Sequence, residues 1–134
     1  MSAQVFANRQ ALADEIARRL AHVPCAVLAI DGRCGSGKTT LAALLAQTLP
    51  CRVVHMDDFY LPFAARRPGW RTTPLGNMDL GRLRREVLEP ARLGEEIAYR
   101  AYDCPHDALR PALLLPPRPL TVVEGSYSLA PALR

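Results

Sequence analysis

The feature that most constrains this chain is a glycine-rich turn between an apolar run and a helix-forming run. The turn, residues 31–40 (DGRCGSGKTT), has glycine at three positions, Gly32, Gly35 and Gly37. The preceding residues 25–30 are apolar and partly β-branched, and residues 41–46 (LAALLA) are strong helix formers. This order predicts a buried strand that passes through a tight turn directly into a helix.

The turn fits the pattern G-x-x-x-x-G-K-[ST] at every fixed position, which defines a phosphate-binding P-loop in this strand–turn–helix context. Glycines let the main chain approach a phosphate closely, and the amides at the helix mouth favour an anion. Lys38 is the only lysine among 17 basic residues, and it brings a mobile charge to the β- and γ-phosphates of ATP. The alternative is a glycine-rich turn with an incidental lysine. The predicted nucleotide-binding residues are Gly32, Gly35, Ser36, Gly37, Lys38, Thr39 and Thr40.

Length and composition indicate one globular domain over residues 1–134. The chain is 49% hydrophobic and 22% charged, which is typical of folded proteins. It contains no apolar run near the roughly 20 residues that span a bilayer and no secretory signal, so we expect a soluble, cytoplasmic protein without a membrane partner. The four cysteines lack C-x-x-C spacing and are expected to be reduced packing residues.

The net charge of +4 raises the question of nucleic-acid binding. The arginines are scattered in pairs at 18–19, 66–67 and 84–85 and form no stripe, so no nucleic-acid partner is predicted. An anionic substrate such as ATP, or simple solvation of the surface, explains the excess equally well.

The rest of the chain alternates helical and extended patterns. An amphipathic helix is predicted over residues 3–20, where Leu12, Ile16 and Leu20 recur at helical spacing. Further predicted elements are a helix at 37–48, strands at 25–30, 52–56 and 120–123, a long loop at 61–77, a helix at 80–88 capped by Asp79, an extended piece at 97–102 and a proline-broken connection at 113–119.

Polar side chains follow each predicted strand. Strands separated by helices form a parallel sheet, so the P-loop, Asp57 and Glu124 are expected on one rim. There Asp57 is positioned to accept a proton from an attacking hydroxyl, and Glu124 is positioned with Thr39 to hold Mg²⁺. The alternatives are a turn or helix cap at Asp57–Asp58 and an ordinary strand-end turn at 124–125.

Taken together, five segments resemble bacterial uridine kinase-like proteins, which belong with phosphoribulokinase and pantothenate kinase to a group of P-loop kinases. The segments are 31–40 (DGRCGSGKTT), 55–60 (HMDDFY), 77–79 (NMD), 99–103 (YRAYD) and 123–128 (VEGSYS). The resemblance covers most of residues 10–130. It implies ATP- and Mg²⁺-dependent phosphorylation of a small-molecule hydroxyl, which in the uridine kinases is the 5′-hydroxyl of uridine or cytidine.

The resemblance also assigns roles to individual residues. Asp57 matches the general base, and Thr39 and Glu124 match Mg²⁺ ligands; Asp57 is counted with them as a candidate ligand. Lys38 is expected to act on the transferred phosphoryl group. The residues implied in substrate binding are Asp79 for the ribose hydroxyls and Tyr102, Asp103 and His106 for the nucleoside pocket; the alternative for His106 is a surface or turn histidine. Tyr60 and Trp70 are candidates for stacking on the nucleoside, and the alternative for both is packing within the loop. Met78 departs from the family, which usually has an aromatic residue there.

Proteins of this group continue past the Glu-Gly segment with two further strands and an arginine-bearing lid, whereas this chain stops at Arg134. The expected fold is therefore an α/β, three-layer P-loop NTPase core with a parallel sheet, a substrate-side insertion at about 59–112, and no C-terminal strands or lid. An uncovered sheet edge is expected to allow a second copy of the chain to associate. The alternative function is a module that binds ATP with little or no transfer.

Overall fold

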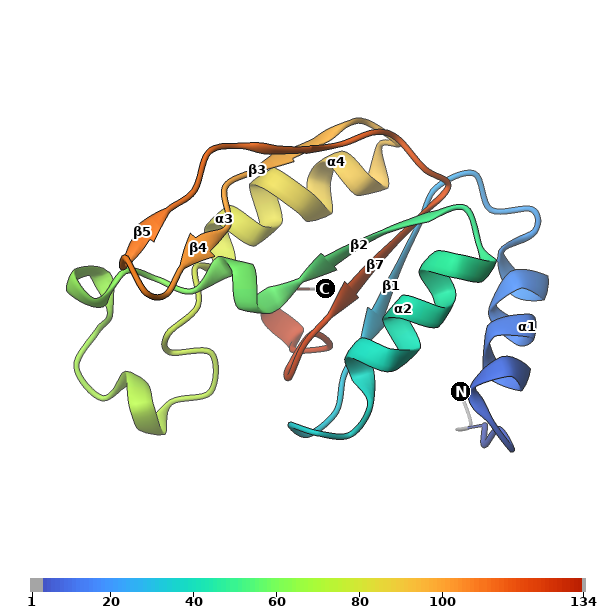
Figure 1. Ribbon diagram of the computed structural model, residues 1–134, viewed down its shortest axis with the longest axis horizontal. Coiled ribbons are helices and arrows are strands. Elements are labelled where there is room, and N and C mark those ends of the chain that lie inside the picture. Colours follow the sequence, from blue (N-terminus) through green and yellow to red (C-terminus); the bar gives the residue numbers. More distant parts are fainter. Residues whose placement is uncertain (1–3, 134) are drawn as a thin grey trace.

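A three-stranded parallel sheet forms the centre of the computed structural model, which describes residues 4–133 (Figure 1). Its strands are β1 (Ala26–Ile30), β2 (Cys51–His55) and β7 (Leu120–Glu124), in the order β1-β7-β2. The register places Ile30, Glu124 and His55 side by side at the carboxyl ends. The α/β fold with a parallel sheet, predicted from the sequence, is thus confirmed, and the carboxyl ends of its three strands lie together at one end of the sheet.

Two helices, α1 (Arg9–Leu20) and α2 (Lys38–Thr48), cover one face of the sheet (Figure 1). Ala13 and Ile16 of α1 and Leu45 of α2 pack with Val122 of β7 in one buried cluster. The side chain of Asn8 accepts a hydrogen bond from the Ala11 amide and caps α1. The prediction that this helix extends back to residue 3 is wrong for residues 4–8, which precede the first helical residue, Arg9; residue 3 itself lies outside the described residues.

The other face is covered by a single helical stretch made of α3 (Leu80–Leu83), a π-helical turn (Arg84–Leu88) and α4 (Glu89–Arg92). The side chain of Asp79 caps it by accepting the Arg82 amide at 3.1 Å, as predicted. The stretch continues past the predicted end at residue 88, and the π-helical turn (Arg84–Leu88) comes directly before α4, where Pro90 has no amide donor for the i→i−4 pattern. No helix within residues 4–133 is long and apolar enough to cross a bilayer.

Short antiparallel pairs run over this helical stretch. β3 (Ile97–Tyr99) pairs with β6 (Leu113–Leu115), and β4 (Tyr102–Asp103) pairs with β5 (Ala108–Leu109). The extended piece at 97–102 was predicted, but β6 was predicted as part of an irregular connection. The error has a simple reason: the prolines begin only at Pro116, so the three preceding leucines keep their amide donors.

A buried arginine ties this layer to the sheet. Arg52 on β2 donates from Nε to the Thr121 hydroxyl at 2.8 Å and from one terminal nitrogen to the carbonyls of Leu115 and Pro116. It is only 5% exposed, so these bonds satisfy most of a charged group that would otherwise be costly to bury.

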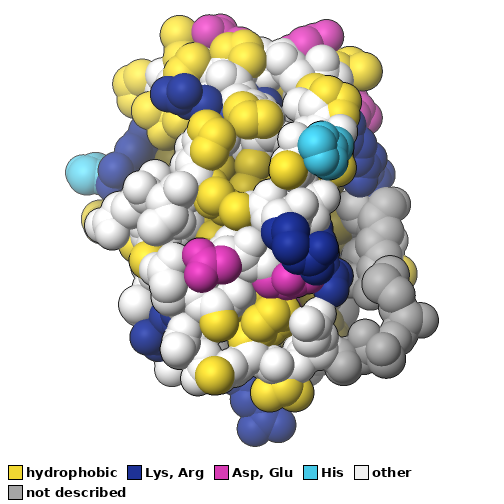
Figure 2. Space-filling view, turned by 90° about the vertical axis from the view of Figure 1, so that its right-hand side faces the viewer, with side chains coloured by type: hydrophobic (Ala, Val, Ile, Leu, Met, Phe, Trp, Pro, Cys, Tyr) yellow, Lys and Arg dark blue, Asp and Glu magenta, His cyan; other side chains and the backbone are white. Residues whose placement is uncertain are grey.

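The outer edge of β1 has no partner strand within residues 4–133. Two mainly apolar cavities of about 470 and 350 Å³ border it, and both are lined by Ala29 and Leu129. Figure 2, which views the molecule from the α1 side, shows hydrophobic side chains gathered down the middle of that face. Association of two copies through this edge stays a prediction.

We expect Gly125→Ala to lower the free energy of unfolding by about 1–3 kcal/mol, because the added methyl group overpacks the core. A Cβ at this position would lie 2.7 Å from Cβ of buried Met56. The matched control is Gly81→Ala in α3, where the nearest atom is the flexible end of Arg85 and helix propensity favours alanine. Urea denaturation measures both; equal effects of the two substitutions would contradict this account of Gly125.

Candidate active site

The glycine-rich turn forms an open loop at the start of α2. Gly35 and Gly37 adopt left-handed backbone angles (φ 77° and 96°), which side chains strongly disfavour, and Gly37 is the N-cap of the helix. Within the loop, Lys38 Nζ donates to the carbonyls of Gly32 and Arg33 at 2.9 and 2.8 Å. The loop thus combines a helix N-terminus with an ammonium group, which is the arrangement that binds phosphate.

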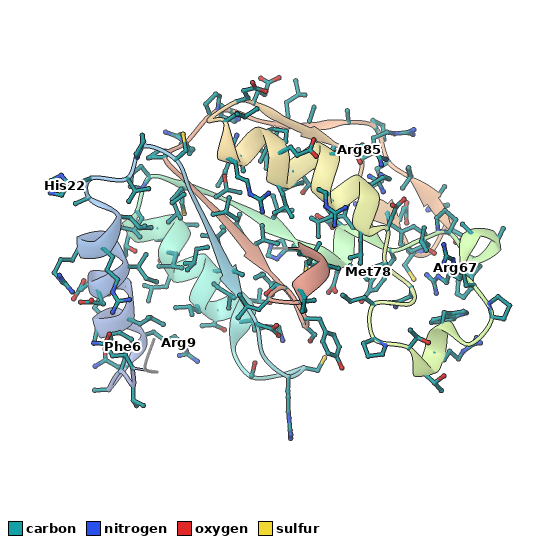
Figure 3. All side chains as sticks on the ribbon, turned by 180° about the vertical axis from the view of Figure 1, so that it is seen from behind. Phe6, Arg9, His22, Arg67, Met78 and Arg85 are labelled. Carbon is teal, nitrogen blue, oxygen red and sulfur yellow. The ribbon has the colours of Figure 1, made fainter. Side chains whose placement is uncertain are left out.

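Different features account for the two fixed glycines of the motif. A Cβ at Gly32 would lie 2.7 Å from Ser36 Oγ, whereas Gly37 is favoured by its left-handed backbone angle. A guanidinium nitrogen of Arg9 lies beside Gly37, 3.1 Å from where a Cβ would stand. Figure 3 labels Arg9 at the start of α1, on the side facing α2. Arg9 brings a second cation to the loop. Sequence analysis missed it because its helix position gives no sign of what the side chain touches.

Asp31 fastens the loop to the segment after β7. Its Oδ1 accepts the amides of Gly32 and Tyr127 at 2.6 and 2.9 Å, and its Oδ2 accepts the amide of Leu129 at 3.1 Å. Burial acts to raise the pKa of Asp31, but the hydrogen bonds from Leu129, Tyr127 and Gly32, together with the charge of Lys38, hold that pKa below its ordinary value. We call these three bonds the Asp31 clamp.

Glu124 at the end of β7 connects the loop with β2. Its Oε1 lies 3.3 Å from the Thr39 hydroxyl and 2.6 Å from His55 Nδ1, and the Glu124 side chain is buried. His55 was not predicted as a site residue. The paired positions of His55 and Glu124 follow from the register of two parallel strands, which the sequence does not state.

A hydroxyl and a carboxylate beside a phosphate loop suit Mg²⁺, which takes oxygen ligands and usually keeps waters and substrate phosphates among them. Thr39 Oγ1 and Glu124 Oε1 are the oxygens present at this point. Within residues 4–133, no three His, Cys, Asp or Glu side chains gather into a metal cluster.

The two aspartates after β2 have separate surroundings. Asp57 Oδ1 accepts the Tyr60 hydroxyl at 3.0 Å, whereas Asp58 Oδ2 accepts the hydroxyl of half-buried Tyr99 at 2.9 Å. Burial and the neighbouring Asp57 carboxylate raise the pKa of Tyr60 to about 12, so Tyr60 remains a donor at neutral pH. Asp57 is therefore held by a neighbouring phenol, and Asp58 is tied to the core.

One cavity of about 510 Å³ unites these groups. Lys38, Thr39, Asp57 and Glu124 all line it, together with Gly35 of the loop. The predicted metal and catalytic residues, and three of the predicted nucleotide-binding residues, are thus brought to one place from three strand ends. The other predicted nucleotide-binding residues, Gly32, Ser36, Gly37 and Thr40, lie outside this lining.

The residues predicted to bind the substrate are mostly placed elsewhere. Tyr60 lines the cavity, but Asp79, Tyr102, Asp103 and His106 lie outside its lining. Tyr102 donates its hydroxyl to Asp107, and Asp103 Oδ2 contacts His106 Nδ1 at 2.8 Å. Their roles in substrate binding stay predictions.

Other residues, to which the sequence analysis assigned no role, line the rest of the cavity. They come from the loop at 61–77 and from the segment after β7: Arg71, Thr72, Thr73, Asn77, Ser126 and Tyr127. Trp70 and Met78, which were considered at the sequence level, are there as well. The length and glycine–proline content of the loop could have indicated Arg71, Thr72 and Thr73. Asn77, Ser126 and Tyr127 stand in the segments 77–79 and 123–128 that carry the resemblance, but they were given no role there.

The site defines the class of the protein as a P-loop kinase-like enzyme. It combines a P-loop at the start of a helix, a carboxylate at each neighbouring strand end and one cavity that they share.

Comparison with solved structures supports this assignment to the P-loop kinases. A candidate uridine kinase from Bacillus stearothermophilus matches with a TM-score of 0.72 and 25% identity, over 91% of this chain and 73% of that one. A candidate fructose transport system kinase from Silicibacter sp. TM1040 matches with a TM-score of 0.76 and 30% identity, over 96% of this chain and 69% of that one.

The chain belongs to the uridine kinase-like family of P-loop kinases. A D-glycerate 3-kinase from Cryptococcus neoformans shares the fold with a TM-score of 0.66 at 17% identity, and this chain spans 53% of its length. No protein-family model and no curated protein matches the chain in comparisons of sequence.

We expect Asp31→Asn to lower the stability of the protein at neutral pH, because the amide weakens the Asp31 clamp. A carboxylate whose pKa is depressed by folding stabilises the folded state above its unfolded pKa, and that contribution is lost as the pH falls through the folded pKa. The stability difference between wild type and variant should therefore narrow as the pH drops below about 4. Urea denaturation across this range measures it; a difference independent of pH would contradict the clamp.

Proposed function

We propose that the protein transfers the γ-phosphoryl group of ATP to a hydroxyl of a small molecule, with Asp57 as the general base. The observation that carries the proposal is the shared cavity, in which Lys38, Thr39, Asp57 and Glu124 face one space. Phosphoryl transfer needs charge neutralisation, alignment of the reactants and an acceptor for the proton of the nucleophile, and these four residues supply those parts.

In the proposed reaction, the acceptor oxygen attacks the γ-phosphorus of ATP. A bond forms between them, the bond from the γ-phosphorus to the bridging oxygen of ADP breaks, and the hydroxyl proton passes to Asp57. Tyr60 holds Oδ1 of Asp57, whereas Oδ2 has no hydrogen-bond partner within residues 4–133. Oδ2 is therefore the oxygen we assign to proton abstraction.

Lys38 is proposed to leave the carbonyls of Gly32 and Arg33 and to bind the β- and γ-phosphates as the nucleotide enters. Thr39 and Glu124 are proposed to hold Mg²⁺ through their oxygens. The ion, when bound, neutralises charge on the phosphates. The contact with His55 then fixes the orientation of the Glu124 carboxylate.

The part of the cavity lined by the loop at 61–77 and by the segment after β7 is proposed to bind the acceptor, and we call it the acceptor side. Its residues determine which substrate fits. The resemblance seen in the sequence proposes uridine or cytidine, and the name of one structural relative agrees with that. The names of two other relatives refer to fructose transport and to D-glycerate, so a small sugar or hydroxy acid is an equally direct expectation.

We expect Asp57→Asn to reduce acceptor-dependent ADP formation by at least about 100-fold, because general-base catalysis is typically worth that much or more. Its affinity for ATP should stay near wild type. The control is Asp58→Asn, which keeps an oxygen for the Tyr99 hydroxyl and should retain transfer.

A coupled assay of ADP release with a panel of acceptors, and with water alone, measures these rates. Parallel loss of ATP affinity in Asp57→Asn would assign Asp57 to metal binding or to structure. ADP release that no acceptor raises above the water rate would overturn the kinase proposal in favour of a module that only binds ATP.

We expect Lys38→Ala to weaken ATP binding by about 10- to 100-fold, which is the value of a charge-assisted hydrogen bond to phosphate. The control is Arg118→Ala, which removes an exposed positive charge just before β7, at the end of the sheet opposite the loop. Isothermal titration with Mg²⁺ and ATP compares the two. Equal affinities in both variants would count against the phosphate site.

A further inference from the structure

The acceptor side of the cavity is formed by the loop at 61–77, and its chemistry differs from that of the phosphate side. Lys38, Asp57 and Glu124 already have parts in the proposed transfer. Among the described lining residues, this leaves Arg71 as the one further charged side chain. The acceptor side is thus distinguished by a cation that the proposed chemistry does not use.

Arg71 is available to a ligand. It makes no ion pair or side-chain hydrogen bond within residues 4–133, and its guanidinium carbon lies 4.4 Å from the centre of the Trp70 ring. Stacking on the indole holds the planar group while leaving its N–H donors free. A guanidinium held in this way suits bidentate binding of a carboxylate or a phosphate.

The platform beneath Arg71 is itself well supported. The guanidinium of Arg66 lies 4.1 Å from the centre of the Phe63 ring and 4.6 Å from that of Trp70, and its Nε donates to the carbonyl of Leu61. The loop closes on itself at Gly76, where a Cβ would lie 2.8 Å from the Trp70 carbonyl oxygen. Such packing orders the loop before a ligand binds and reduces the entropy cost of binding.

Neutral partners on the same wall complete the site. The side-chain amide of Asn77 lines the cavity and has no hydrogen-bond partner within the described part of the chain. The hydroxyls of Thr72 and Thr73 donate to the Gly69 carbonyl and keep acceptor capacity. These groups suit the hydroxyls of a small polar molecule.

We propose that the phosphate acceptor is a small hydroxylated anion whose carboxylate or phosphate is bound by Arg71 in this cavity. The inference rests on the proposed function and narrows its substrate class. A neutral nucleoside would leave this cation without a partner. The tyrosine and aspartate that the family resemblance assigns to the nucleoside are bonded to Asp107 and His106 outside the cavity.

The competing explanation is that Arg71 is an ordinary solvated arginine. Arg67 provides the matched control, because it lies in the same loop, is exposed, makes no side-chain ion pair or hydrogen bond within residues 4–133 and does not line the cavity (Figure 3). Arg71→Gln and Arg67→Gln each remove one positive charge from the same loop. The two variants therefore have the same net charge, and a difference between them reflects the position of the arginine.

The test is an equilibrium measurement of acceptor affinity in the presence of Mg²⁺ and ADP, by isothermal titration or thermal shift. The probes are matched pairs: D-glycerate with glycerol, a sugar monophosphate with its sugar, and uridine monophosphate with uridine. In wild type, the charged member of at least one pair should bind about tenfold more tightly than its neutral match. The ratio should fall close to one in Arg71→Gln and stay at the wild-type value in Arg67→Gln. The pair that shows the effect also distinguishes a carboxylate from a phosphate.

Wild-type protein that binds no charged probe more tightly than its neutral match overturns the inference. So does a ratio that Arg71→Gln leaves unchanged or that both variants reduce equally. These binding outcomes are independent of turnover, so they differ from the failure of the kinase proposal, which is an absence of acceptor-dependent ADP release. If the protein phosphorylates a neutral acceptor and Arg71→Gln leaves that activity unchanged, the kinase proposal stands and the proposed anion site is overturned.

Discussion

The pairing of β7 with β1 on one side and β2 on the other is the constraint on which the site depends. The register sets Ile30, Glu124 and His55 at one level, so the residues that follow β1 and β2 start from the same end of the sheet, where the strands have their carboxyl termini. A slip of one residue would turn the Glu124 side chain to the opposite face, because side chains alternate along a strand. The shared cavity is therefore a consequence of backbone hydrogen bonding more than of the chemistry of any one side chain.

At the carboxyl ends of the strands, the carboxylates of Asp31 and Glu124 accept hydrogen bonds that hold the loop and the strand ends together. Asp31 binds amides on both sides of the β1–β7 junction, and Glu124 reaches Thr39 and His55. Cations approach from outside this frame, Arg9 beside the loop and Arg71 on the acceptor wall. Lys38 and Arg71 share the cavity with Asp57 and Glu124, so it offers cations suited to anionic groups and carboxylates suited to a proton or a metal ion.

The sequence predicted the parts of this structure that local chemistry determines. The glycine pattern predicted the phosphate loop, strand–helix alternation predicted the parallel sheet, and Asp79 was recognised as a helix cap. Two kinds of contact could not be predicted: bonds between distant segments, such as that of His55 with Glu124, and packing inside an irregular loop, such as the stacking of Arg66 on Phe63. These depend on register and on loop packing, neither of which leaves a periodic signal. The residues assigned by resemblance to the nucleoside pocket, Tyr102, Asp103 and His106, stay predictions, and they lie outside the lining of the cavity.

The most direct test of the central claim is a crystal structure with Mg²⁺ and a non-hydrolysable ATP analogue. The account predicts the β- and γ-phosphates within hydrogen-bond distance of Lys38 and of the amides at the start of α2. It also predicts the metal ion bound to the Thr39 hydroxyl and, directly or through one water, to Glu124, with Asp57 facing the γ-phosphate. A nucleotide bound away from this loop, or an Asp57 carboxylate turned out of the cavity, would contradict the account.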